Sequence, residues 1–250
     1  MLLKKLIAIV LIAYLFLLLV FTLVASHYLS IPPSIANLPD FSAIEDTKAR
    51  KSAFFSYFGA IIEAKNRQLS TKREALLLMQ EQWQEHGQLN GKNKKRLRQL
   101  SASFGVEATD PAQAIKELLL RVDIIPASMV LAQAANESGW GRSRFALQGY
   151  NYFGQWCYTK GCGIVPNKRA ANAGHEVRVF RSPARSVAAY FKNINTHRAY
   201  REVRQIRESL RTQQQPLRGS ALVAGLGQYS ERGAAYIEEL RAMIRANKLE

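Results

Sequence analysis

Glu137 is the residue whose type and surroundings are best suited to acid–base chemistry. It ends an apolar, alanine-rich run, and Trp140 follows three residues later between Gly139 and Gly141. A helix C-terminus carries partial negative charge, and an indole ring beside a carboxyl group excludes water. Both effects disfavour the ionised form, so we expect the pKa of Glu137 to be raised. An acid that stays protonated near neutral pH can protonate a leaving group, as glycoside hydrolysis requires.

The residues around Glu137 form a pattern with fixed offsets: Gln133-Ala134, Glu137-Ser138, Trp140-Gly141, Ser143, Ala146 and Asn151-x-Phe153-Gly154. This pattern closely resembles the signature of the glucosaminidase family of peptidoglycan hydrolases and, within it, the Bax-type proteins of Gram-negative bacteria. The resemblance extends from Leu38-Pro39-Asp40-Phe41 to Tyr236 and covers roughly residues 38 to 248. Without this pattern, a helix-capping glutamate on a solvated surface would be the simpler interpretation of Glu137.

The resemblance implies a mainly helical, lysozyme-like α+β domain with a cleft between the helices and a small β lobe. It implies an endo-acting β-N-acetylglucosaminidase that cuts the glycan strands of peptidoglycan, with Glu137 and Tyr236 as catalytic residues. We expect substrate contacts from aromatic, amide and glycine positions near them: Trp140, Asn151, Phe153, Gly154, Trp156 and Tyr229. The chain departs from the family pattern at Ser230-Glu231-Arg232, where an acidic residue and a proline are more usual.

Two other functions fit part of the sequence. A lytic transglycosylase or muramidase shares a catalytic glutamate and this fold, but Glu137-Ser138 is not followed by the Gly-x-x-Gly-Leu-Met-Gln type of segment found in that family. A non-catalytic envelope scaffold that binds glycan and recruits partners would suit a membrane anchor, a long helical N-terminal section and a basic surface.

Glu176 is the candidate for a second catalytic carboxylate. The alternating stretch from His175 to Phe180 predicts a short strand of the β lobe, which we expect to face the cleft. An inverting enzyme needs two carboxylates about 6.5–9.5 Å apart and a retaining enzyme about 5–5.5 Å. A substrate acetamido group acting as internal nucleophile would make a second nucleophilic carboxylate dispensable, and Glu176 would then be a surface residue.

The N-terminus predicts an uncleaved signal anchor. Lys4 and Lys5 precede an apolar run at 6–25, interrupted only by Thr22, whose twenty residues span about 30 Å as a helix. The lysines place residues 1–5 in the cytoplasm, so the body of an inner-membrane protein would lie in the periplasm. Cleavage near Ala25 is the alternative. Residues 26–40, which include three prolines, form the expected linker.

The elements that must position the site are mainly helices, in an N-terminal section at 41–108 and a catalytic domain at 109–250. Capping signals and apolar periodicity predict helices at Asp46–Gln68, from Ser70 onward, at Lys92–Ser101, from Asp110-Pro111, from Pro126 to Glu137, from Pro183 onward and within 222–246. The aromatic stripe at 54–58 is expected to pack in the core, with a carbohydrate platform as the alternative.

The cysteines and the net charge limit the classes of ligand. Cys157 and Cys162 are the only cysteines and no histidine cluster completes a zinc site, so we expect a periplasmic disulfide and no metal or cofactor. The net charge of +16 is spread along helices without a nucleic-acid motif. Peptidoglycan, other acidic envelope polymers and lipid headgroups are therefore the expected partners, with a merely solvated basic surface as the alternative. The sequence does not identify a protein partner.

Overall fold

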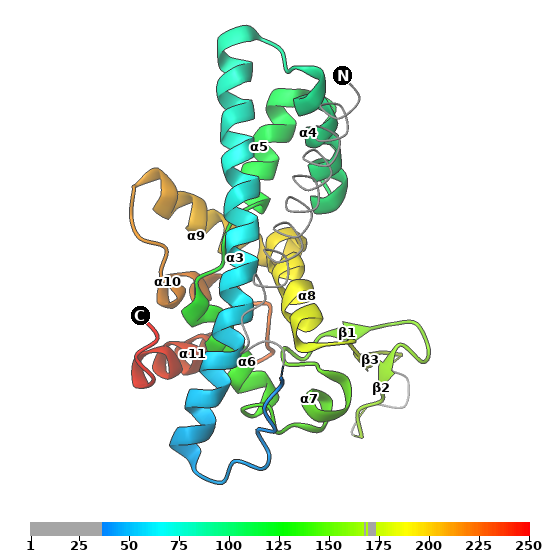
Figure 1. The fold of residues 1–250 in the computed structure, drawn as a ribbon, viewed down its shortest axis with the longest axis vertical. Helices are drawn as coiled ribbons and strands as arrows, with labels where there is room; N and C mark the ends of the chain where they lie inside the picture. The colour runs from blue at the N-terminus through cyan, green and yellow to red at the C-terminus, as the bar shows by residue number, and fades with distance from the viewer. Residues whose placement is uncertain (1–36, 168, 170–173) are drawn as a thin grey trace, which may run out of the picture. The chain divides into compact units, whose positions relative to one another are not determined.

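The computed structural model describes residues 37–167, 169 and 174–250 (Figure 1). The predicted anchor at 6–25 and residues 26–36 of the predicted linker lie outside the described residues. Within the described part of the chain, no helix is both long and apolar enough to cross a bilayer. Residues 40–250 form one compact unit.

Helix α3 (Thr47–His86) is continuous over 40 residues and forms the long axis of this unit (Figure 1). Asp46 caps its start by accepting a 2.7 Å hydrogen bond from the Ala49 amide. The predicted break at Ser70 is wrong. Leu69 and Leu76 are buried on the face that continues the aromatic stripe, and this packing outweighs the weak helix preference of one serine.

The aromatic stripe on α3 is part of the core. Phe54 and Phe58 are completely buried, and their ring centroids lie 4.6 Å apart. Phe41 packs on Phe54 from the segment before the helix, and Tyr152 packs on Phe58 at 4.5 Å. These contacts exclude the stripe as an exposed carbohydrate platform.

Three helices follow at the predicted positions: α4 (Gly91–Phe104), α5 (Pro111–Arg121) and α6 (Ala127–Ser138). Asn90 and Asp110 cap the first two through side-chain oxygens that accept amide bonds. Most residues of α6 are buried, because this helix lies between α3 on one side and α10 (Gly219–Leu222) and α11 (Ala234–Ala246) on the other. The C-terminal end of α6 is therefore held by elements from both halves of the chain.

Helix α9 (Arg201–Thr212), which follows α8 (Pro183–Thr196), carries part of the basic charge into the interior. A 3-10 turn at Arg198–Tyr200 joins them, and a second at Val223–Leu226 follows α10. Arg207 is 1% exposed and donates to the carbonyls of Leu120 and Ile124. Arg211 and Arg73 pair with the buried Asp123. The 460 Å³ cavity between α3, α5 and α9 is lined by these same groups, which are already bonded to one another or to backbone.

The β lobe consists of α7 (Arg144–Gly149) and a three-stranded antiparallel sheet of order β1-β3-β2. Its strands are β1 (Trp156–Cys157), β2 (Gly163–Ile164) and β3 (Glu176–Arg178), and Val177 pairs with both Trp156 and Ile164. The predicted mainly helical α+β class with a small β lobe is thus confirmed, and the strand predicted within 175–180 is the central one.

Candidate functional site

Glu137 lies in the last turn of α6, partly accessible to solvent. Its Oε1 accepts a 2.7 Å hydrogen bond from the Tyr236 hydroxyl. Burial raises the pKa of Glu137 above its ordinary value, although the bond from Tyr236 and the charge of Arg232 act against that rise. The direction agrees with the sequence-based expectation, but its main cause is the packing around the α6 terminus, to which α11 contributes.

Tyr236 connects Glu137 to a buried polar chain. This tyrosine on α11 is 1% exposed, and its hydroxyl accepts a 2.9 Å hydrogen bond from Gln133 Nε2. Gln133 Oε1 in turn accepts a hydrogen bond from the Tyr190 hydroxyl on α8. Burial raises the pKa of Tyr236 far beyond its ordinary range, so this phenol stays neutral and can donate.

Sequence reasoning did not assign Gln133 or Tyr190 to the site. Gln133 precedes Glu137 by four residues, and this spacing puts the two side chains on one face of a helix. A glutamine in an alanine-rich buried helix also requires hydrogen-bond partners. These two signals were available in the sequence. Nothing in the sequence indicated Tyr190, which lies 57 positions away.

Gly154 borders the other oxygen of Glu137. A Cβ atom at this exposed glycine, whose φ is +63°, would lie 3.5 Å from Oε2. The preceding Phe153 stacks on Tyr190 at 4.2 Å, and its carbonyl accepts a 2.7 Å bond from the Tyr229 hydroxyl. The loop is therefore held by Tyr190 and Tyr229, and its glycine leaves open space beside the acid.

An exposed ion pair lies near Tyr236 and acts on Glu137. Arg232 and Glu239 are 2.6 Å apart, and the Arg232 guanidinium lies 5.5 Å from the Tyr236 ring centroid. The charge of Glu239 raises the pKa of Glu137, opposing Arg232. Sequence reasoning did not assign Glu239 to the site. Glu176 is not among the groups that shift the pKa of Glu137.

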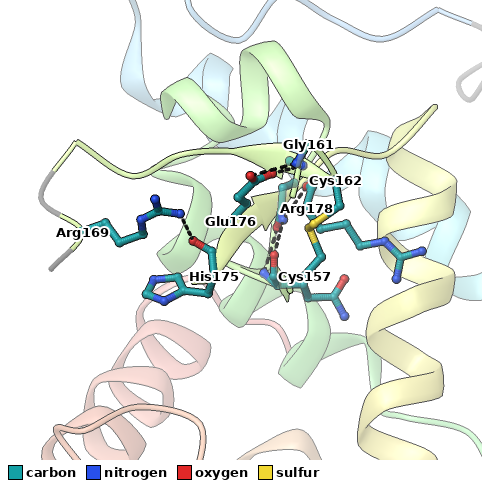
Figure 2. The surroundings of a disulfide bond; sticks show 10 residues. Cys157, Gly161, Cys162, Arg169, His175, Glu176 and Arg178 are labelled. Carbon is teal, nitrogen blue, oxygen red and sulfur yellow. Dashed lines mark hydrogen bonds between the residues drawn. A yellow bond between two sulfur atoms is a disulfide. The ribbon is translucent and has the colours of Figure 1, made fainter. Parts of the chain in front are cut away.

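The structure gives Glu176 a different role from the expected base. Its Oε1 accepts a 2.9 Å bond from the Gly161 amide, which faces it in Figure 2. Its Oε2 accepts a 2.8 Å bond from the Gly163 amide. These bonds, with a smaller contribution from Arg169, lower its pKa. Glu176 therefore holds the turn between β1 and β2 as an ionised carboxylate, and its side chain is engaged within the lobe.

Cys157 and Cys162 form a disulfide beside Glu176 (Figure 2). The bond joins β1 to the residue just before β2. The two sulfurs and the carboxylate lie within 4.8 Å of one another, an arrangement that includes metal-ligating residue types. Both sulfurs are bonded to each other in the disulfide, and both carboxylate oxygens accept hydrogen bonds from amides. This donor set therefore does not suit a cation.

The remaining expected substrate contacts fall into two groups. Trp140 packs edge-on against Phe55 at 5.2 Å, with Lys51 above its ring, so it is fixed toward α3. Asn151 is 1% exposed and bonds to the carbonyls of Gln155 and Arg178, which shapes the loop. Both residues build the scaffold of the site.

Trp156 is the member of that set with the largest free surface. Its side chain is 55% exposed and stacks on His175 with ring centroids 4.0 Å apart. Exposed aromatic faces of this kind can stack on the apolar C–H faces of sugar rings. The structure thus brings Glu137, Tyr236, Tyr229, Phe153 and Gly154 together and leaves Trp156 outward on the β lobe.

Comparison with known proteins agrees with this arrangement. The model of the glucosaminidase family, described as mannosyl-glycoprotein endo-beta-N-acetylglucosaminidase, matches residues 112–249, which include Glu137, the β lobe and Tyr236. The protein bax of Escherichia coli (strain K12) is 34% identical over 215 residues, which are 85% of this chain and 75% of that relative. No solved structure matches the chain. The chain belongs to the glucosaminidase family and is a Bax-type member of it.

Proposed function

We propose that this protein is a membrane-anchored peptidoglycan hydrolase, an endo-acting β-N-acetylglucosaminidase with Glu137 as its general acid. One observation carries the proposal. Glu137 is a partly buried carboxyl group with Oε1 bonded to a neutral tyrosine and Oε2 beside an exposed glycine. This arrangement favours a proton on the oxygen that a bound glycan can reach.

The first chemical step follows from that geometry. The proton on Oε2 passes to the glycosidic oxygen while the bond between that oxygen and the anomeric carbon breaks, and the bond electrons leave with the oxygen. Glu137 becomes a carboxylate in the same step. The 2.7 Å bond from Tyr236 and the positive charge of Arg232 stabilise this charge as it forms.

The second step needs a nucleophile at the anomeric carbon. Glu176 was the expected base, but its two amide bonds and lowered pKa make it a weak proton acceptor. The acetamido oxygen of the substrate is the better candidate, because an N-acetylated sugar brings it to the reacting carbon without any protein carboxylate. Water then forms a bond to the anomeric carbon of the resulting cyclic oxazolinium while the ring C–O bond breaks, which regenerates the acetamido group. The proton released by the water passes to the Glu137 carboxylate and restores the acid.

The anchor at 6–25 places this activity, in our proposal, on the periplasmic side of the inner membrane. The basis is Lys4-Lys5 followed by twenty apolar residues. A protease added to spheroplasts should digest the body of the protein, which should fractionate with the inner membrane. Protection in spheroplasts with digestion in lysed cells would contradict this orientation.

Muropeptide analysis tests the reaction itself. Purified sacculi are incubated with the full chain or with Glu137→Gln, and the released fragments are identified by mass spectrometry. New reducing-end N-acetylglucosamine from the wild type alone would support the proposal. Anhydro-muramic acid ends would indicate a lytic transglycosylase, reducing-end muramic acid a muramidase, and binding without release a glycan-binding scaffold.

A further inference from the structure

Three buried polar side chains form one line of hydrogen bonds that ends on Glu137. Tyr190 donates to Gln133 Oε1, Gln133 Nε2 donates to the Tyr236 hydroxyl, and that hydroxyl donates to Glu137 Oε1. Gln133 and Tyr190 are fully buried and Tyr236 is 1% exposed. Solvent cannot supply replacement partners in such a position, so each group depends on the next.

The direction of this line depends on the amide of Gln133, which has one donating and one accepting end. With the amide reversed, its carbonyl oxygen would face Tyr236 and would accept the hydrogen bond from that hydroxyl. Tyr236 could then no longer donate to Glu137. The acid would have to carry its proton on Oε1, turned toward Tyr236 and away from Gly154.

Tyr190 selects between the two directions. Within the described residues, Gln133 Oε1 is the acceptor for its hydroxyl. Reversal would turn the amide nitrogen toward Tyr190 and leave that O–H donor without an acceptor in a fully buried position. An unsatisfied buried donor is destabilising, so the observed direction is preferred.

We propose that Gln133, held by Tyr190, is a positioning residue that orients the Tyr236 hydroxyl toward Glu137 Oε1 and thereby keeps the acidic proton on Oε2. The inference rests on the proposed role of Glu137 as general acid. Gln133 touches neither substrate nor reacting atoms in this proposal and acts only through Tyr236.

Two substitutions change the line at different points. Gln133→Met keeps the side-chain length but removes both hydrogen bonds, and Tyr190→Phe removes only the hydroxyl that holds the amide. Gln133→Met should lower kcat by roughly ten- to a hundredfold, the rate equivalent of one hydrogen bond to a charged group. Tyr190→Phe should cause a smaller loss in the same direction.

A titration distinguishes positioning from a merely structural role. The bond from Tyr236 favours ionised Glu137, so weakening it should move the titration midpoint of this carboxyl to higher pH. The midpoint is followed by carbon-13 NMR of the full chain in detergent, with the Glu137 signal assigned by its loss in Glu137→Gln. Tyr57→Phe, which changes a buried tyrosine on α3 outside this line, is the matched control and should leave the midpoint in place.

The decisive experiment repeats Gln133→Met in a Tyr236→Phe background. If Gln133 acts through Tyr236, it should cause no further change of midpoint or rate there. An equal change in both backgrounds, or an unmoved midpoint in both Gln133→Met and Tyr190→Phe, would overturn the inference. If Gln133→Met does not fold, Tyr190→Phe with the same background decides. A shifted midpoint in a protein that cleaves no glycan would support the positioning role and contradict the proposed activity instead.

Discussion

The helical site and the β lobe each contain a partly enclosed glutamate, and the two regions treat that carboxyl group in opposite ways. Glu137 receives one hydrogen bond from a neutral phenol, and burial raises its pKa. Glu176 receives bonds from two backbone amides, which lower its pKa. Burial alone therefore does not keep a carboxyl group protonated. The number and kind of donors aimed at the carboxyl group decide whether it holds a proton or a charge.

The two glutamates also differ in whether a carboxyl oxygen stays free for a substrate. One oxygen of Glu137 stays open beside Gly154, whereas both oxygens of Glu176 are occupied within the lobe. A group that must transfer a proton needs an unoccupied oxygen that a substrate can reach. By this criterion Glu137 is suited to catalysis and Glu176 to holding the turn at 161–163.

Removing the acidic proton should have the largest effect. Glu137→Gln keeps the size and most hydrogen bonding of the side chain, so we expect glycan cleavage to fall about 10²–10⁴-fold. The release of reducing ends from peptidoglycan measures the loss. Glu202→Gln, at an exposed glutamate of α9, is the control and should keep the wild-type rate. A folded Glu137→Gln protein with undiminished activity would show that Glu137 only caps the end of its helix.

Filling the open side of the acid should have the next largest effect. Gly154→Ala places a methyl group 3.5 Å from Oε2, and its positive φ adds strain of roughly 1–2 kcal/mol. Gly87→Ala is a matched control, because Gly87 has nearly the same φ, +65°, with nothing within 4 Å of its Cβ position. Both variants should lose similar stability in thermal unfolding, but only Gly154→Ala should lose cleavage activity, by about tenfold or more. Equal activities would show that substrate does not approach Oε2.

The two carboxyl groups should change stability with pH in opposite directions. The pKa of Glu137 is raised in the folded state. Ionisation of this group therefore lowers the free energy of unfolding as pH rises above 4.5, the ordinary pKa of a glutamate. The folded pKa of Glu176 is lowered, so this group stabilises the fold above pH 4.5, and that contribution is lost as pH falls through the folded pKa.

Melting temperatures of the two glutamine variants measure this contrast. At neutral pH, Glu137→Gln should match or exceed the wild type, and Glu176→Gln should melt lower. Both differences should shrink on acidification. Glu176→Gln should also retain activity within a few-fold of wild type at a temperature where it is folded. A loss as large as that of Glu137→Gln would restore Glu176 as the catalytic base.

The smallest effect is expected from the disulfide. Cys157 and Cys162 are five positions apart, and closing so short a loop is worth about 2 kcal/mol in the chain-entropy view. Replacing both by serine should speed hydrogen exchange at the Gly161 and Gly163 amides, which face Glu176, while exchange in α6 stays unchanged. Faster exchange in α6 as well would mean that the lobe and the helical site are not separate.

The helix boundaries were predictable wherever a local signal determines them. Asn90, Asp110 and Ser182 all cap helices through their side chains, and Pro111 and Pro183 occupy first-turn positions. The missed case is Ser70, where the local signal for a new helix conflicted with a continuous buried face. Long-range packing decided in favour of one helix, and that packing is not visible in a short window of sequence.

The proximity of Glu137 and Tyr236 agrees with the sequence-based expectation, whereas the contacts of several neighbours were not predictable. Asn151 and Trp140 belong to the same motif as the acid, yet they bond and pack inward to shape the loops around it. A residue can belong to the motif because it shapes the loops around the acid, without contacting the substrate. The partners of Gln133 and Glu176 come from distant or irregular segments, so only the folded chain reveals what these polar groups bind.

Phe41 has a consequence for the design of fragments. It is 2% exposed, packs on Phe54 and Phe58, and occupies the space where a side chain at Gly141 would lie. The segment before α3 therefore supports the loop that follows the acid. A truncated protein that starts at residue 47, or at residue 112 where the family match begins, would lack the Phe41 side chain and should be inactive or insoluble. The shortest useful expression fragment begins upstream of Phe41.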